Sequence, residues 1–467
     1  MIVKNVKSGV KMKKIRIDII YYIVISFFAL FFILNTGLGY MDELFNFMGA
    51  RNIAFGLLPY KDFNIISTPL SFFVNSLVLL IKPTLFVFRI LFFIYYLVII
   101  FLLDKIIKLL KVCLFFKYFS VFIISYLLLS GYLDYNFIQL ILILLLIYLS
   151  LKNINYKDKK LNIVIPIIAG FTVINKQSTG LMICFVTIFL MFLNDKKNWK
   201  FILKEIGFML IPIVLFLIYL LLSDSLFYFF DLSILGITTF SNKFINHFCA
   251  IVLISAYISM TILLILYKER KFTILYWYAI ASLFVVVPIL DVVHFNLAFV
   301  ILLVLITYIL DKKFGKLFDN YILLFSIVIV IMISGINNVY SYFSSYRIQS
   351  GIYKNIPVTL RLRGNVENVS QFILKESKEH NVYIADFTSP LYNLNINRYT
   401  KYFDLFMNGN FGVSGEKEIY NIIDEKNQII LIDRRESNWQ CPKRIINYVK
   451  NNYNKCGMIN QFDIYCN

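Results

Sequence analysis

MDELFNFMGARNIAFGLLPYKDFNIISTPL, residues 41–70, interrupts a chain that otherwise consists largely of long apolar segments. It opens with two adjacent carboxylates, Asp42 and Glu43, just after the first of those segments. Apolar residues at helical spacing follow, and Gly56 and Pro59 end the predicted helix. Carboxylates held at the mouth of a membrane bundle cost free energy, so they usually belong to a site or a pathway. A solvated loop between two spans is the alternative interpretation.

The composition identifies the class of protein. The chain has 467 residues, of which 60% are hydrophobic and 18% aromatic, and its mean hydropathy is +0.75. Several apolar runs reach the length of ~18 residues that is typical of a spanning helix. The formal net charge of +19 would suit nucleic acid, but the cations gather in short stretches between apolar segments, as they do beside membranes. We therefore predict a polytopic α-helical membrane protein that contacts membrane lipids and no nucleic acid.

Twelve apolar segments are candidates for spans. They are residues 18–37, 65–81, 84–103, 112–131, 136–151, 161–175, 178–193, 205–222, 247–267, 272–290, 295–310 and 319–336.

The distribution of Lys and Arg selects among these candidates, because cytoplasmic loops are enriched in cations. Six basic stretches hold 24 of the 30 Lys and Arg before residue 337. All 24 fall on the cytoplasmic side if the segment 65–81, which contains Pro69 and Asn75, lies beside the membrane instead of crossing it. We therefore predict about eleven spans, with twelve or thirteen as alternative counts, and a first outer loop, 38–83, that carries juxtamembrane helices. The N-terminus is then cytoplasmic, the C-terminus is extracytoplasmic, and the protein lies in the plasma membrane.

This topology gathers rare polar residues on the outer side, where they could reach one cavity. Each has a structural alternative: Asp134 could cap a helix, Lys176 could extend to the interface, and His294 could be packed. The loop 223–246 and Asp291 lie on the same side. The candidate substrate-binding residues are Arg89, Asp134, Lys176, Gln177 and His294.

Residues 337–467 have a different composition, without an apolar segment long enough to span. Strand-like runs at 381–387 and 428–434 alternate with helical patterns near 366–378, 416–424 and 443–452, and the run INQFDIYC ends the chain. The chain thus divides into a membrane bundle, 1–336, and a small extracytoplasmic α/β domain, 337–467. The domain has no Gly-rich phosphate loop.

The six cysteines do not have the spacing of metal ligands. Cys456 and Cys466 are near one another in the predicted extracytoplasmic domain, where thiols can be oxidised. We predict a disulfide between them, with Cys441 as the competing partner.

Short motifs in the bundle resemble the GT-C superfamily of lipid-sugar-dependent glycosyltransferases. They are the acidic pair after the first span, G-x-x-P-Y-x-D-F at residues 56–63, and Pro69-Leu70. Within that superfamily the sequence resembles bacterial relatives of the protein mannosyltransferases and of the aminoarabinose transferases of lipid A. In that family the next outer loop carries a second acidic residue, where this chain has Asp134. NKQSTGL at 175–181 and the C-terminal α/β domain also resemble it.

The resemblance implies a hexosyl- or pentosyltransferase that moves a sugar from polyprenyl phosphate to a glycan, lipid or protein acceptor on the outer face. Asp42 is the candidate base, because partial burial would raise its pKa. Glu43 would share that role or orient the acceptor, and Lys176 and Arg89 would stabilise the leaving phosphate. We predict no metal or other cofactor, although a divalent ion held by Asp42 and Asp134, as in the oligosaccharyltransferase branch, is left open.

Two other classes of membrane protein remain as alternatives. A polysaccharide polymerase or ligase would have a comparable bundle, but we expect its bulk in a large loop between spans. A lipid-linked glycan flippase or transporter would not need the C-terminal domain, and the sequence shows no internal repeat of the kind that many transporters have. Neither the sugar, the acceptor nor the oligomeric state follows from the sequence.

Overall fold

The computed structural model describes residues 2–39, 41–129, 134–154, 157–194, 199–239, 247–266, 269–287, 289–315, 346–435 and 441–467. The expected span 319–336 and the expected domain boundary at 336/337 lie outside these ranges.

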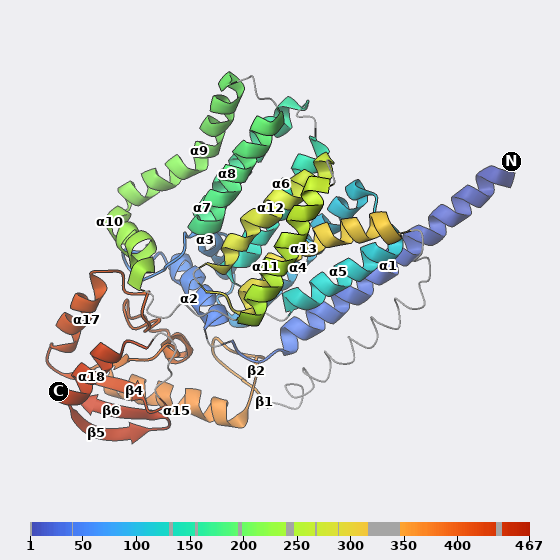
Figure 1. Ribbon diagram of the computed structural model, residues 1–467. Helices are drawn as coiled ribbons and strands as arrows, with labels where there is room; N and C mark the ends of the chain where they lie inside the picture. Colours follow the sequence, from blue (N-terminus) through green and yellow to red (C-terminus); the bar gives the residue numbers. More distant parts are fainter. Residues whose placement is uncertain are drawn as a thin grey trace.

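In the described part of the bundle the named secondary-structure elements are all helices (Figure 1). Its α-helices are α1 (Ile2–Asn35), α2 (Asp42–Ala54), α3 (Leu70–Leu79), α4 (Leu85–Leu110), α5 (Leu114–Leu129), α6 (Tyr135–Lys152), α7 (Lys159–Asn175), α8 (Gln177–Asn194), α9 (Trp199–Leu222), α10 (Leu226–Phe229), α11 (His247–Leu266), α12 (Arg270–Ser282) and α13 (Val292–Phe314). A π-helical turn, η1 (Phe230–Leu235), and two 3-10 turns, η2 (Gly236–Thr239) and η3 (Leu283–Val286), complete it.

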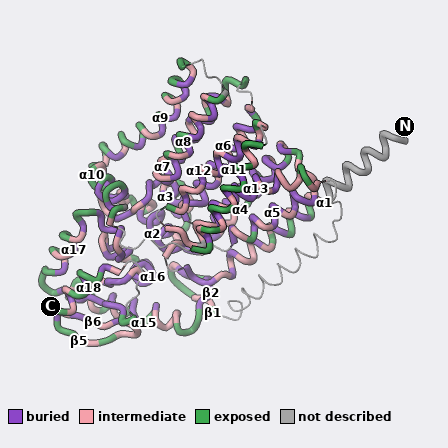
Figure 2. Tube along the Cα trace, viewed as in Figure 1, coloured by how far each residue is buried: buried purple, intermediate pink, exposed green. Residues whose placement is uncertain are grey.

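Six of these helices, α1, α4, α6, α9, α11 and α13, are long and apolar enough to cross a membrane. The segments expected to span as α5, α7, α8 and α12 are helices of 16, 17, 18 and 13 residues. The protein is therefore a polytopic membrane protein, as predicted. Burial differs between its helices, since 67% of the apolar 18-residue window in α6 but only 22% of that in α11 is buried. Figure 2 shows the exposed stretches of α9.

The segment 65–81 forms only the ten-residue helix α3. At 1.5 Å per residue such a helix is about 15 Å long, half the thickness of the hydrocarbon core. Its length therefore argues against a crossing. The segment 223–246, expected as a loop, instead contains α10 and the turns η1 and η2, because residues Leu226–Leu235 form an apolar run.

The C-terminal domain begins with the two short strands β1 (Tyr346–Arg347) and β2 (Pro357–Val358). It continues with α15 (Leu360–Glu376), β3 (Asn381–Ile384), α16 (Ser389–Asn393), the 3-10 turn η4 (Leu394–Ile396), α17 (Gly415–Ile423), β4 (Gln428–Asp433), α18 (Lys443–Asn452), β5 (Asn454–Ile459) and β6 (Phe462–Cys466). The sheet order is β3-β4-β6-β5, with β3 parallel to β4 and the other pairs antiparallel. The small α/β domain, with its helices and its first two expected strands, agrees with the sequence patterns.

Strand β4 explains how this domain joins the bundle, because it is buried on both faces. Ile429 and Leu431 point to a core that is continuous with the bundle. Ile430 and Ile432 point to a second core under α17 and α18. The period of two thus makes this strand the layer between two cores. Figure 1 shows the domain at one end of the bundle, beside α2 and α10.

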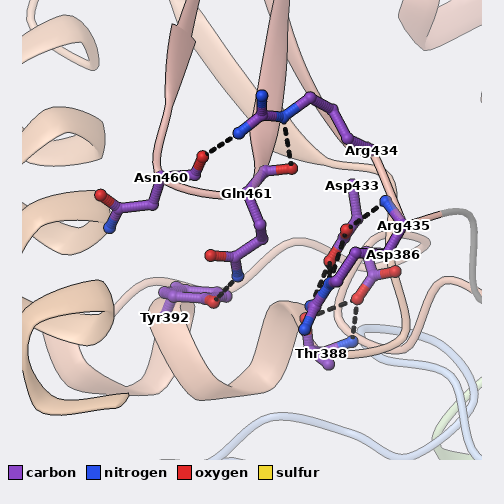
Figure 3. Close-up of polar contacts among 8 residues, drawn as sticks. All are labelled: Asp386, Thr388, Tyr392, Asp433, Arg434, Arg435, Asn460 and Gln461. Atoms are coloured by element: carbon purple, nitrogen blue, oxygen red, sulfur yellow. Dashed lines mark hydrogen bonds and ion pairs between the residues drawn. The ribbon is translucent and has the colours of Figure 1, made fainter. Parts of the chain in front are cut away.

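Polar contacts and the disulfide fix the ends of the strands. Cys456 and Cys466 join β5 to β6 with a Cα–Cα distance of 6.0 Å, which confirms that prediction and excludes Cys441 as the partner. Arg434 donates from its backbone to Gln461 across the sheet (2.9 Å), and Figure 3 shows this region, where the guanidinium of Arg435 is paired with Asp433.

Candidate active site

Helix α2 carries the first predicted catalytic residue at its first position. The helix ends in a Schellman arrangement, in which Gly56 donates to the Ile53 carbonyl (2.9 Å) and Leu57 donates to the Asn52 carbonyl (3.0 Å). Gly56 has φ +86, which glycine adopts at little cost. Helix α2 packs against α3 on one side and α16 of the C-terminal domain on another, so Asp42 sits on a helix supported from both domains.

A cavity of about 210 Å³ opens beside Asp42. Its wall is mostly apolar and is built from the bundle and the C-terminal domain together. The lining residues are Met41, Asp42, Phe45, Ile66, Ser67, Tyr135, Lys176, Gln177, Ser178, Val287, Ile289, Asp291, His294, Leu405 and Met407. Four of the seven predicted site residues therefore line one cavity, although they come from α2, the α7–α8 junction and the start of α13.

The Asp42 carboxyl has a raised pKa. Burial is the main cause, the charges of Asp134 and Asp291 add to it, and His294 opposes it, so the pKa of Asp42 lies at about 6. Such a carboxyl is ionised at neutral pH but close enough to neutrality to accept a proton during a reaction.

Lys176 is the buried cation of this cavity, with 5% of the residue exposed. Its ammonium donates to Asn136 Oδ1 (3.1 Å) and to the Val285 carbonyl (2.7 Å), and it lies 5.3 Å from the centre of the Tyr135 ring. These three partners are uncharged. Burial lowers the pKa of Lys176 to about 8, against the attraction of nearby carboxylates. Among the described residues no carboxylate contacts this ammonium directly, and a buried cation in that state is suited to an anionic ligand.

Asp134 caps α6 and acts on Lys176 through a neighbour. Its oxygens accept from the backbone (2.9 Å) and the side-chain amide (2.6 Å) of Asn136, whose Oδ1 in turn accepts from Lys176. Burial raises the pKa of Asp134, against His294, Asn136 and Lys176. Asp134 does not itself line the cavity. The capping interpretation is therefore confirmed, and a role of Asp134 in the site stays a prediction.

Asp291 and His294 form a pair at the start of α13. The His294 backbone donates to Asp291 Oδ1 (2.8 Å), which also lies 2.8 Å from His294 Nδ1. Burial alone would raise the pKa of Asp291, but the contacts with His294 outweigh it and lower this pKa.

Gln177 and Ser67 bring the first loop to the wall of the cavity. The amide of Gln177 donates to the Ile66 (3.3 Å) and Ser233 (3.0 Å) carbonyls and its oxygen accepts from the Thr68 backbone (3.4 Å). The Ser67 hydroxyl is buried without a hydrogen-bond partner in the described chain. A buried hydroxyl in that state at a cavity wall is available to a ligand.

Glu43 and Arg89 lie elsewhere and pair with each other. Arg89 Nε is 2.7 Å from Glu43 Oε1 and Arg89 Nη2 is 2.9 Å from Oε2, with side chains 2% and 3% exposed. The guanidinium also donates to the carbonyls of Thr36 (2.7 Å) and Gly37 (2.8 Å). Neither residue is among those lining the cavity. The pair instead locks the end of α1 to α2 and α4.

Sequence reasoning did not single out several residues of the cavity. Tyr135 directly follows Asp134, so its position was within reach of the same argument. Leu405 and Met407 come from the C-terminal domain, and no local pattern marks them. Within the described ranges, no three Asp, Glu, His or Cys side chains are grouped closely enough to hold a metal ion.

No protein-family model matches the sequence, and no curated protein matches it.

Solved structures of ArnT from Cupriavidus metallidurans are similar to the whole chain. The apo structure has a TM-score of 0.56 at 10% identity and covers 98% of this chain and 98% of its own. The structure bound to undecaprenyl phosphate has a TM-score of 0.58 at 10% identity and covers 96% of this chain and 97% of its own. At this identity the likeness concerns the fold. The chain is therefore a multi-pass membrane protein whose fold is similar to that of ArnT, and the predicted fold class is confirmed.

Proposed function

We propose that this protein is an integral membrane glycosyltransferase that moves a sugar from a polyprenyl phosphate carrier to an acceptor hydroxyl. The observation that carries the proposal is one cavity that brings Asp42 together with the buried cation Lys176. A base and an anion-stabilising cation are the two groups that such a displacement needs. The mostly apolar wall of this cavity suits a lipid carrier. Its volume of about 210 Å³ has room for little more than the reacting groups.

In this mechanism the acceptor oxygen attacks the anomeric carbon while its proton passes to the Asp42 carboxylate. The bond between the sugar and the phosphate breaks, and Lys176 stabilises the phosphate that leaves. The pKa values of about 6 and about 8 make Asp42 ionised and Lys176 charged together at neutral pH. The Ser67 hydroxyl is a further donor for the phosphate or the sugar.

The remaining predicted residues then act by position. Asp134 orients Asn136, and Asn136 orients the Lys176 ammonium. Gln177 fixes the loop that carries Ser67. His294 lines the cavity and contacts the sugar or the acceptor.

Glu43 and Arg89 take a different role in this proposal from the one that their sequence context suggested. The pair sets the angle at which α2 leaves the end of α1, and thereby the direction of Asp42. It does not contact the substrates.

The carrier and the face of the membrane belong to the same proposal. The ArnT structure that contains undecaprenyl phosphate has this fold, which supports a polyprenyl phosphate donor. The six basic stretches, which hold 24 of the 30 Lys and Arg before residue 337, support a cytoplasmic N-terminus and an extracytoplasmic C-terminal domain. The active site then faces outward, where nucleotide sugars are absent.

A donor-consumption assay tests the proposal. The purified protein in lipid nanodiscs receives a panel of undecaprenyl-phosphate-linked sugars, each with crude cell-envelope glycans, lipids or peptides as acceptors. We expect release of undecaprenyl phosphate from at least one donor, dependent on the acceptor. Consumption of a nucleotide sugar instead, or transport of a lipid-linked glycan without loss of its sugar, would contradict the proposal.

A further inference from the structure

A second, larger cavity lies behind the wall of the first. Its volume is about 740 Å³. It is bounded by Thr239 of the bundle, by the starts of α17 and α18, and by Asn408, Gly409, Phe411, Gly412 and Val413. Residues 405–413, here called the wall segment, therefore face two cavities. Leu405 and Met407 line the cavity of Asp42, and all residues from 408 to 413 except Asn410 line the second one.

The wall segment is held firmly between the domains. Asn64 of the first loop donates to the Asn410 carbonyl (2.8 Å). On the other side, Asp231 accepts from the Val413 backbone (3.0 Å) and from the Ser414 hydroxyl (2.7 Å). Gly412 has φ +68, and a Cβ there would lie 2.1 Å from Asp231 Oδ2. The close approach explains the glycine, and the two anchors keep the cavities adjacent.

The second cavity has a chemical character of its own. Lys443 and Arg444, both exposed, line it from the first turn of α18, and Glu416 lines it from the first turn of α17. The N-terminal ends of both helices add partial positive charge. The remaining lining includes amide, hydroxyl and backbone groups. A polar cavity with excess positive charge is suited to a hydrophilic anion and unsuited to a lipid chain.

We propose that this second cavity is an acceptor subsite that binds an anionic saccharide, with Lys443 and Arg444 as its charged contacts. The inference rests on the proposed transferase function. The catalytic cavity is small and apolar, so it accommodates the reacting end of an acceptor but not the rest of a hydrophilic glycan. A cavity of about 740 Å³ is in the range of small-ligand sites. The wall segment contributes residues both to this cavity and to the cavity of Asp42.

Direct binding tests the subsite without relying on turnover. The full-length protein in nanodiscs is titrated calorimetrically with tri-galacturonic acid, with its neutral counterpart maltotriose, and with a short glycerol phosphate oligomer. We expect both anionic probes to bind more tightly than maltotriose. The tighter of the two identifies carboxylate or phosphate as the natural charge. Equal binding of charged and neutral probes, or binding of neither anion, would overturn the inference.

Two variants and a matched control locate the binding. The double variant Lys443→Ala/Arg444→Ala should weaken the anionic probes about tenfold, and Val413→Trp should block the cavity by bulk. Lys378→Ala/Lys426→Ala removes two exposed lysines elsewhere in the same domain and should change nothing. Equal effects of the two double variants would show a general charge effect and defeat the assignment.

A separate measurement distinguishes failure of the subsite from failure of the transferase proposal. Undecaprenyl phosphate binding depends on the first cavity and should be unchanged in Lys443→Ala/Arg444→Ala. Loss of lipid binding in that variant would show that the second cavity does not act as an independent site. If the wild-type protein binds the anions but not undecaprenyl phosphate, the anion site stands and its role in lipid-linked transfer is refuted.

Discussion

The substitution Asp42→Asn isolates the proposed base, because it keeps the shape of the side chain and removes only its ability to take a proton. Asp42 lies at the first position of α2 and lines the cavity. This helix is anchored by backbone hydrogen bonds at Gly56 and by the Glu43–Arg89 ion pair, and neither anchor involves the Asp42 carboxyl. We therefore expect the variant to fold and to accumulate in the membrane like the wild type.

The expected magnitude follows from the role of a general base. Such a group contributes about 10²–10⁴-fold to the rate, which is about 2.7–5.4 kcal/mol of transition-state stabilisation. The assay is sugar transfer from an undecaprenyl-phosphate-linked donor by purified protein, compared with undecaprenyl phosphate binding in the same preparation. Transfer should fall by that factor, while binding should change little because Lys176 remains.

The pH dependence gives an independent check on the same residue. Deprotonated Asp42 is the active form, so the rate should fall as pH decreases through about 6, the pKa to which burial raises this carboxyl. The acidic limb should disappear in Asp42→Asn. On the alkaline side Lys176 loses its charge above about 8, so the wild-type profile should be bell-shaped.

Asp224→Asn is the matched control. Asp224 is an exposed carboxylate, with 84% of its side chain accessible, that is paired with Lys61 outside the cavity. Its substitution should leave transfer and the pH profile unchanged. Near-normal turnover by Asp42→Asn with an intact acidic limb would refute the assignment of the base.

Three further substitutions test the rest of the site and the fold. Lys176→Ala should weaken binding of undecaprenyl phosphate by about 10- to 100-fold in a calorimetric titration, because a charge-assisted contact is lost; unchanged affinity would remove Lys176 from the donor site. Glu43→Gln leaves the buried Arg89 without its carboxylate and should lower the free energy of unfolding by about 3–5 kcal/mol. The loss should be measured as a lower temperature of thermal unfolding in detergent. Full stability with lost transfer would instead support a direct catalytic role of Glu43. Replacing Cys456 and Cys466 by Ala removes the disulfide between β5 and β6 and should destabilise the C-terminal domain by about 2–3 kcal/mol, measured by denaturant unfolding. Mass spectrometry that finds both thiols reduced in native membranes would contradict this contribution of the disulfide to stability.

Local patterns predicted the elements well where one period dominated. Residues 429–432 of β4 are continuously apolar because two cores cover the strand. The helices α15, α17 and α18 have polar and apolar faces that a 3.6-residue period reveals. The segment 223–246 was harder, because an apolar run gives a hydrophobic signal whether it crosses a membrane or lies beside it.

The site was predicted only in part, because side-chain direction is not local information. Asp42 and Glu43 are adjacent in sequence, but successive residues of an α-helix point about 100° apart. One therefore lines the cavity and the other meets Arg89. Leu405 and Met407 reach the cavity through the docking of the C-terminal domain on α2, a contact between segments more than 300 residues apart that no local sequence pattern encodes.

The central claim is that one cavity holds the lipid phosphate next to the catalytic base. A cryo-electron microscopy structure of the protein in nanodiscs with undecaprenyl phosphate tests it most directly. The account predicts phosphate density within hydrogen-bonding distance of Lys176 Nζ and beside Asp42, with the lipid chain leaving towards the membrane. Phosphate density elsewhere, such as in the polar cavity behind the wall segment, together with an unoccupied Asp42 cavity, would contradict it.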